Sequence, residues 1–93
     1  MAVAFMIPGA LREHAGNRAE VRIDTAAGPL STALASLWAE CPGVRDRVLD
    51  ERGRVRTHIN IFVDGENIRY SGGLDTPLRP DSEVFIIPAV SGG

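Results

Sequence analysis

A short apolar run near the end of the chain, Glu83-Val84-Phe85-Ile86-Ile87, constrains the fold more than any other segment. Pro80-Asp81-Ser82 precedes it and Pro88 follows it, which is the pattern of a buried strand. A strand that is apolar on successive residues is typical of the centre of a sheet, so we expect it to be central and parallel to the first strand. Proline has no N–H to donate, and we therefore expect strand pairing to end at Pro88.

The other strands follow from alternating apolar residues. This alternation predicts strands at residues 3–7, 20–24 and 59–63. Asp64-Gly65 is a strong signal for a two-residue hairpin, and it predicts a further strand at residues 66–70. Between the first two strands we expect a polar loop that contains His14.

One amphipathic helix is predicted between the second and third strands. Its apolar stripe recurs at helical spacing and consists of Leu30, Leu34, Leu37, Trp38 and Cys41. Pro29 is expected at the first helical position, Pro42-Gly43 at the end, and a second short helical turn at residues 44–50. The order ββαβββ predicts an α+β protein with a ubiquitin-like β-grasp fold, in which a mixed sheet of four to five strands packs on one main helix. We expect a single domain over residues 1–93.

The two faces of the last strand are expected to differ. If Val84 and Ile86 face the helix, Phe85 and Ile87 face away from it, and Phe62 on a neighbouring strand points the same way. An exposed apolar patch on a small protein usually marks a partner surface. The alternative is that the segment after Pro8 folds over these side chains.

The chain closes with Val90-Ser91-Gly92-Gly93. Glycine has no Cβ, so two glycines in succession can enter a channel that is too narrow for other residues. We expect residues 88–93 to form a flexible tail, with the Gly93 carboxylate as the reactive group beside Gly92. Glycines at a terminus are also common as frayed ends, so the preceding strand carries the argument.

Other candidate sites are weaker. His14, His58 and Cys41 show no local catalytic signature, and Cys41 on the apolar helix stripe is more simply a core residue. No metal-ligand spacing is present. We read Gly72-Gly73 as a tight turn because no P-loop lysine accompanies it. The arginines at 52, 54 and 56 are expected on one solvated strand face.

Composition narrows the class of protein. The 93 residues carry a net charge of −2, with 44% hydrophobic and 5% aromatic residues, which argues against a nucleic-acid module. One cysteine excludes an intrachain disulfide. We find no membrane span or signal peptide pattern and expect a cytoplasmic protein. All ten basic residues are arginine, so the surface offers an activated carboxyl no lysine amine.

Three segments in order resemble the ThiS/MoaD family of ubiquitin-like sulfur carriers. They are residues 60–74, with Phe62-Val63-Asp64-Gly65-Glu66 and Ser71-Gly72-Gly73, then Pro80-Asp81-Ser82-Glu83-Val84, and the end Ile87-Pro88-Ala89-Val90-Ser91-Gly92-Gly93. More narrowly, the chain is similar to the carrier of the actinobacterial thiocarboxylate-dependent cysteine pathway. The detailed similarity covers the last third of the chain, and the rest matches in the order of its elements.

The resemblance implies a protein cosubstrate and not an enzyme. An ATP-dependent, E1-like activating enzyme would adenylate Gly93, and a sulfurtransferase would then supply the sulfur of a C-terminal thiocarboxylate. A PLP-dependent cysteine synthase would accept this sulfur, and a zinc metalloprotease would release cysteine. ATP, PLP and zinc would belong to these partners, and this chain would bind no cofactor or metal. Phe62, Phe85, Ile87, Val90 and Ser91 are the expected partner-binding residues.

Three alternatives remain open. The sulfur acceptor could be molybdopterin, thiamine thiazole or a thio-containing natural product. The chain could instead be a protein modifier that is joined through Gly93 to lysines of other proteins. Finally, it could be a β-grasp interaction module whose diglycine end carries no chemistry.

Overall fold

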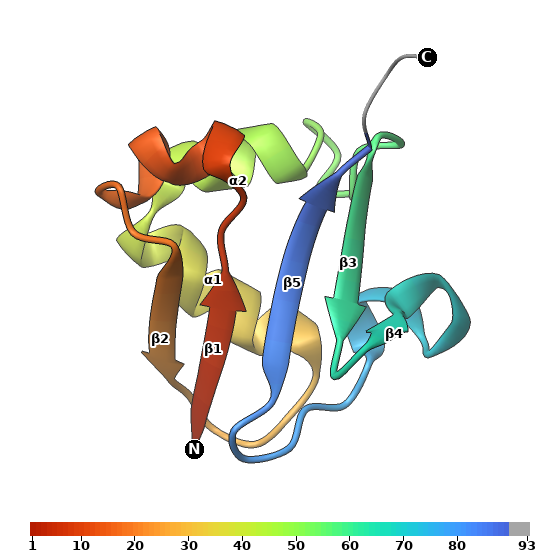
Figure 1. Cartoon of the computed structure of the whole chain (residues 1–93). Coiled ribbons are helices and arrows are strands. Elements are labelled where there is room, and N and C mark those ends of the chain that lie inside the picture. Colours follow the sequence, from red (N-terminus) through yellow and green to blue (C-terminus); the bar gives the residue numbers. More distant parts are fainter. Residues whose placement is uncertain (90–93) are drawn as a thin grey trace.

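The computed structural model describes residues 1–89 as a five-stranded mixed sheet with helices packed on one face (Figure 1). In chain order the elements are β1 (Ala2–Met6), η1 (Gly9–Ala15), β2 (Glu20–Asp24), α1 (Leu30–Glu40), α2 (Pro42–Val48), β3 (Ile59–Val63), β4 (Glu66–Asn67), η2 (Ile68–Tyr70), η3 (Gly73–Asp75) and β5 (Glu83–Pro88), where η marks a 3-10 helix. The order of strands across the sheet is β2-β1-β5-β3-β4. The central position of β5 and its parallel pairing with β1 confirm the prediction from its apolar run, and the β-grasp fold is confirmed with it.

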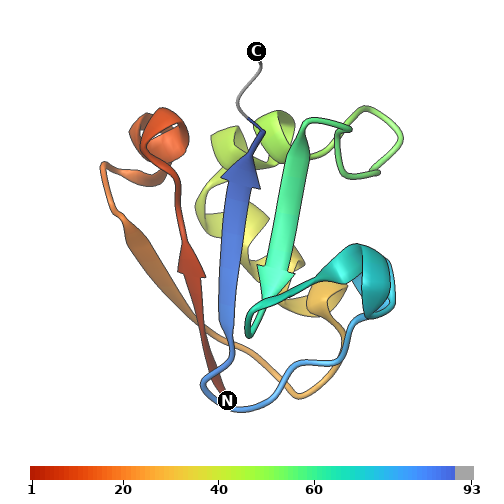
Figure 2. The same cartoon turned by 45° about the vertical axis from the view of Figure 1, so that its right-hand side comes forward.

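The hydrophobic core lies between the sheet and α1. Leu30, Leu34 and Leu37 from the helix are at most 2% exposed, and Phe5 and Ile86 from the sheet are equally buried. Figure 2 shows both α helices behind the sheet, with α1 running obliquely across it. Burial of apolar area on this inner face is the main stabilising contribution that the fold can make at this size.

The segment after Pro8 is not the expected polar loop but the 3-10 helix η1. Leu11 and Ala15 from this helix are buried in the core, which holds the segment against the end of the sheet. It also packs on α2, where Gly43 permits close approach of the two elements. A Cβ at Gly43 would lie 2.9 Å from His14 Nδ1. Tertiary packing therefore orders a segment that has no helical repeat of its own.

The hairpin after β3 is confirmed, but the strand that follows is shorter than predicted. Asp64 and Gly65 have φ angles of 50° and 90°, as the favoured two-residue turn requires. Pairing then stops at Asn67, because its side-chain oxygen accepts the Arg69 N–H at 3.0 Å and starts the 3-10 turn η2. This turn places Ile68 in the core at 5% exposure.

The helix boundaries differ from those predicted by about one turn or less. Pro29 is the N-cap of α1 and not its first helical residue. Pro42 begins α2, so the short second helix starts two residues earlier than expected and ends at Val48. Arg52 and Arg54 belong to a turn region after α2 and not to one strand face. Among the described helices, none has the length and apolar character needed to cross a bilayer.

Candidate functional site

The candidate site is centred on β5, which pairs with a neighbouring strand on each side. Met6 of β1 pairs with Phe85, and Phe62 of β3 pairs with Phe85 from the other side. Residues that pair directly across a sheet point to the same face. Met6, Phe85 and Phe62 therefore form a row across the outer face, away from the helices. Ile87 lies further along the same face, opposite Asn60.

The exposure of side chains alternates along β5 as the sequence predicted. Val84 and Ile86 are 0% and 1% exposed, whereas Phe85 and Ile87 are 39% and 44% exposed. Phe62 is half-buried beside them. We call Phe62, Phe85 and Ile87 the outer patch. The segment after Pro8 leaves this patch open, so the alternative that it folds over these side chains is wrong.

A hollow of about 340 Å³ lies next to the outer patch. Phe85 and Ile87 line one side, and Met6, Pro8 and Arg12 line the other. Arg12 is the only charged residue among the described lining residues, and its Nε donates to the Ile7 carbonyl oxygen at 3.0 Å. Sequence reasoning missed these neighbours.

Met6 could have been found in the sequence. Parallel pairing of the first and last strands, combined with period-two alternation, places it beside Phe85. Arg12 offered no comparable signal, because its position depends on the unforeseen 3-10 helix.

A buried hydroxyl fixes the start of β5 relative to the hairpin turn. Ser82 is 2% exposed; its Oγ donates to Asp64 Oδ2 and accepts the Arg79 N–H, each at 2.9 Å. Asp64 Oδ1 also accepts the Glu83 N–H at 2.9 Å. A slip of one residue would turn every side chain of β5 to the opposite face. These bonds therefore hold the register that leaves Phe85 on the outer face.

The expectation that strand pairing ends at Pro88 is confirmed, because β5 ends there and Ile59↔Pro88 is the last pair with β3. Ala89 N–H flanks this pair and donates to the His58 carbonyl oxygen at 2.6 Å. The nitrogen of Pro88 faces the opposite side of β5, where pairing with β1 has already ended at Phe85, so its missing N–H leaves no ladder position unfilled. Val90, Ser91, Gly92 and Gly93, which were predicted to contact partners or carry the chemistry, lie outside the described residues.

The weaker candidates do not form a site in the described part of the chain. Cys41 is buried, and its sulfur accepts a hydrogen bond from Arg18 Nη2 at 3.4 Å. No hydrogen bond within residues 1–89 joins it to His14 or His58. The same residues contain no group of three histidine, cysteine or carboxylate side chains that could hold a metal ion. Cys41 is thus a core residue, as its place on the helix stripe suggested.

Comparison with known proteins assigns the family. The model of the ThiS family matches residues 5–93. The sulfur carrier protein CysO of Mycobacterium tuberculosis is 35% identical over 95 residues, which cover 100% of each chain.

Solved structures agree with this assignment. The crystal structure of the Amycolatopsis orientalis BexX/CysO complex contains a chain that matches with a TM-score of 0.86 at 28% identity, over 98% of this chain and 99% of that one. Haloferax volcanii SAMP1 matches with a TM-score of 0.85 at 28% identity over 100% of both chains. The protein therefore belongs to the ThiS family of ubiquitin-like sulfur carrier proteins.

Proposed function

We propose that this protein carries sulfur as a thiocarboxylate on Gly93 and donates it to a small-molecule acceptor, most directly for cysteine biosynthesis. The observation that carries the proposal is the outer patch, because Phe85 and Ile87 are exposed on the strand that leads into the tail. Membership of the ThiS family supports the same chemistry. The protein acts as a cosubstrate, as its similarity to proteins named sulfur carriers supports.

The chemistry requires activation of the terminal carboxylate. A Gly93 carboxylate oxygen attacks the α-phosphorus of ATP, which releases pyrophosphate and leaves a mixed anhydride with AMP. Hydrosulfide that a sulfurtransferase has released then adds to the carbonyl carbon and loses its proton. The carbon–oxygen bond to AMP breaks as the carbon–sulfur bond forms, and the thiocarboxylate remains bound to the protein. Glycine at 92 and 93 allows the tail to enter a narrow active site.

The body of the protein provides recognition. An activating enzyme and a sulfur-accepting synthase, such as a PLP-dependent cysteine synthase, each have to find the carrier and take up its tail. The outer patch offers both the same apolar anchor, and we expect Val90 and Ser91, which precede Gly92 and Gly93 in the sequence, to contact the same partners. A zinc metalloprotease that releases cysteine would act on the same tail. Similarity to CysO supports cysteine as the product over molybdopterin, thiazole or a natural product.

Charging of the purified protein tests the proposal. Incubation with the activating enzyme of its natural host, ATP and a sulfur source should add about 16 mass units, as one oxygen is replaced by sulfur at an activated acyl centre. Deletion of Gly93 should abolish this gain, and Cys41→Ser should leave it unchanged. Persistence of the shift after the deletion, or its loss in Cys41→Ser, would contradict a thiocarboxylate on Gly93.

A second candidate, a protein modifier, is favoured by the structural match to the Haloferax volcanii modifier SAMP1. The chain has no lysine, so it could label other proteins but could not form lysine-linked chains on itself. Mass spectrometry of the protein from its host separates the two functions. A carrier returns with Gly93 free or as a thiocarboxylate, whereas abundant isopeptide conjugates without thiocarboxylate would establish the modifier.

A further inference from the structure

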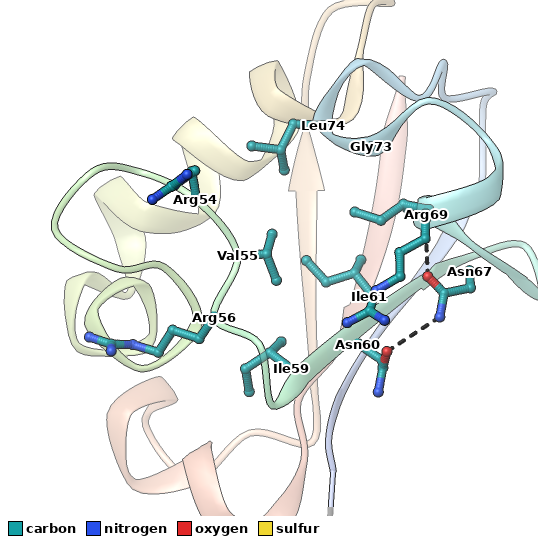
Figure 3. Close-up of a pocket in the computed structure, with 11 residues that line it drawn as sticks. Arg54, Val55, Arg56, Ile59, Asn60, Ile61, Asn67, Arg69, Gly73 and Leu74 are labelled. Carbon is teal, nitrogen blue, oxygen red and sulfur yellow. Dashed lines mark hydrogen bonds between the residues drawn. The ribbon is translucent and has the colours of Figure 1, made fainter.

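A second pocket lies at the edge of β3, apart from the outer patch. Its volume is about 280 Å³, just under the roughly 300–1,000 Å³ of small-molecule sites. Figure 3 shows Val55, Ile59, Ile61 and Leu74 pointing toward one another across it. These side chains come from the segment before β3, from β3 itself and from η3. The pocket therefore has an apolar floor, and its volume suits one large side chain.

The charges around this pocket have one sign. Its lining contains Arg54, Arg56 and Arg69 and, within the described chain, no carboxylate. Arg54 pairs with Asp50 at 3.8 Å, and Arg56 donates from Nε and Nη2 to the Asp46 carbonyl oxygen. In Figure 3 the guanidinium groups of Arg54 and Arg56 point away from the pocket, whereas the Arg69 side chain extends across Ile61.

Arg69 is the arginine whose charge remains available at this pocket. It is exposed, and no salt bridge is formed by it within residues 1–89. Within the same residues the Arg69 side chain makes no hydrogen bond. Only its main-chain N–H is bonded, to the Asn67 side chain. An occupant with a carboxylate near its apolar group would complement this site.

The neighbours of β3 close its main chain along the same pocket. β4 pairs only with Phe62 and Val63, so within the described chain no strand pairs with Ile59–Ile61 on this side. Ile59 and Ile61 are nevertheless only 3% and 1% exposed, and the Ile59 N–H donates to the Arg56 carbonyl oxygen at 3.0 Å. An occupant of the pocket therefore meets side chains and not free main-chain groups of β3.

We propose that the pocket is a docking site for an acidic segment of a partner protein. The segment places one large apolar side chain between Val55 and Leu74 and pairs a carboxylate with Arg69. A second copy of this chain is a poorer occupant, since docking of two copies through this pocket would bring both Arg69 side chains into one interface without a lining carboxylate. The site is independent of sulfur transfer by Gly93.

Binding of synthetic peptides tests this site. The probes are two sets of fluorescein-labelled decapeptides that carry alternating Val, Ile, Leu or Phe, one set with Asp and Glu between them and a matched set with Lys. Fluorescence anisotropy with the full chain should detect saturable binding of acidic peptides, weakened by added salt because the charge pair is screened. Absence of binding by the acidic set, or equal binding by the basic set, would overturn the proposal.

Matched charge reversals locate the peptide. Arg69→Glu should weaken binding by about tenfold or more, because it replaces attraction by repulsion at the rim. Arg52→Glu changes an exposed arginine that does not line the pocket and should leave the affinity within about twofold. An unchanged affinity in Arg69→Glu, or an equal loss in both variants, would refute the placement.

Two further measurements separate the remaining occupants. In NMR titrations, the amides of Ile59 and Ile61 should shift on peptide binding and those of Phe85 and Ile87 should not. Shifts confined to the outer patch would contradict the site. Sedimentation that reveals a dimer sensitive to Arg69→Glu would instead identify a second copy as the occupant and overturn the acidic partner.

Discussion

The two faces of β5, a strand of six residues, carry alternate side chains and serve opposite purposes. On the inner face, Val84 and Ile86 are fully buried against the core; on the outer face, Phe85 and Ile87 are about two-fifths exposed. All four are apolar, so composition alone does not separate them. The separation comes from register, because the period-two geometry of a strand assigns neighbours to different faces.

This difference explains why an apolar side chain is tolerated on the open face. A strand that only had to stabilise the sheet could carry polar residues at 85 and 87, as antiparallel sheets with one solvated face commonly do. Apolar residues there expose area to water and contribute less to folding than those on the inner face. Their position beside the segment that leads to Gly93 instead suits a partner surface.

The largest expected effect is on the inner face. Ile86→Ala should lower the free energy of unfolding by about 2–5 kcal/mol, because it leaves a cavity under α1. Phe85→Ala should lower it by about 1 kcal/mol, because much of that ring already contacts water. Urea denaturation of both variants, monitored by circular dichroism, measures the contrast. Equal losses of unfolding free energy in the two variants would show that both faces of β5 contribute equally to stability.

A smaller effect is expected where the register of β5 is fixed. Ser82→Ala removes the hydroxyl that bridges Asp64 and the Arg79 N–H, and it should lower the free energy of unfolding by about 1 kcal/mol. The sheet should keep its register, since the Glu83 N–H still donates to Asp64. Interstrand contacts in NMR spectra check this. A shifted pairing of Phe62 with β5 would mean that the Ser82 hydroxyl alone fixes the register of β5.

The smallest effect is expected at Pro88. Its nitrogen faces no paired strand, so Pro88→Ala should cost only about 0.4–1 kcal/mol, through greater freedom of the unfolded chain. Thermal denaturation at several pH values should give the same small difference. A gain in stability would indicate that the new N–H finds a partner and that pairing on the β1 side can extend beyond Phe85.

The sequence allowed prediction of β5 and its faces, because alternation and flanking prolines are local signals. It did not predict η1, which is ordered by burial of Leu11 and Ala15 and shows no periodic pattern. The early end of β4 was also missed, since it depends on capture of the Arg69 N–H by the Asn67 side chain. Long-range packing decides the first feature, and a local side-chain hydrogen bond decides the second.

The same limit applies to the candidate site. Phe62, Phe85 and Ile87 could be assigned to one face from period-two alternation. Arg12 could not be assigned, because only the three-dimensional position of η1 brings it beside the patch. The pocket beside β3 was equally hidden, since a strand over all of residues 66–70 would have replaced η2, which carries Arg69 to its rim.

The most direct test of the account is the rate at which Phe85→Ala is charged on Gly93. The variant keeps the tail and the inner face, so any loss reports on the outer patch alone. We predict a melting temperature lowered by only about 4–8 °C, as a loss of about 1 kcal/mol gives in a domain of this size. Binding to the activating enzyme should be about thirtyfold weaker, since loss of an aromatic anchor costs on the order of 2 kcal/mol. The rate of the 16-unit mass gain, followed by mass spectrometry at subsaturating carrier, should fall accordingly. Unchanged stability together with unchanged charging would contradict the account and assign recognition to the tail alone.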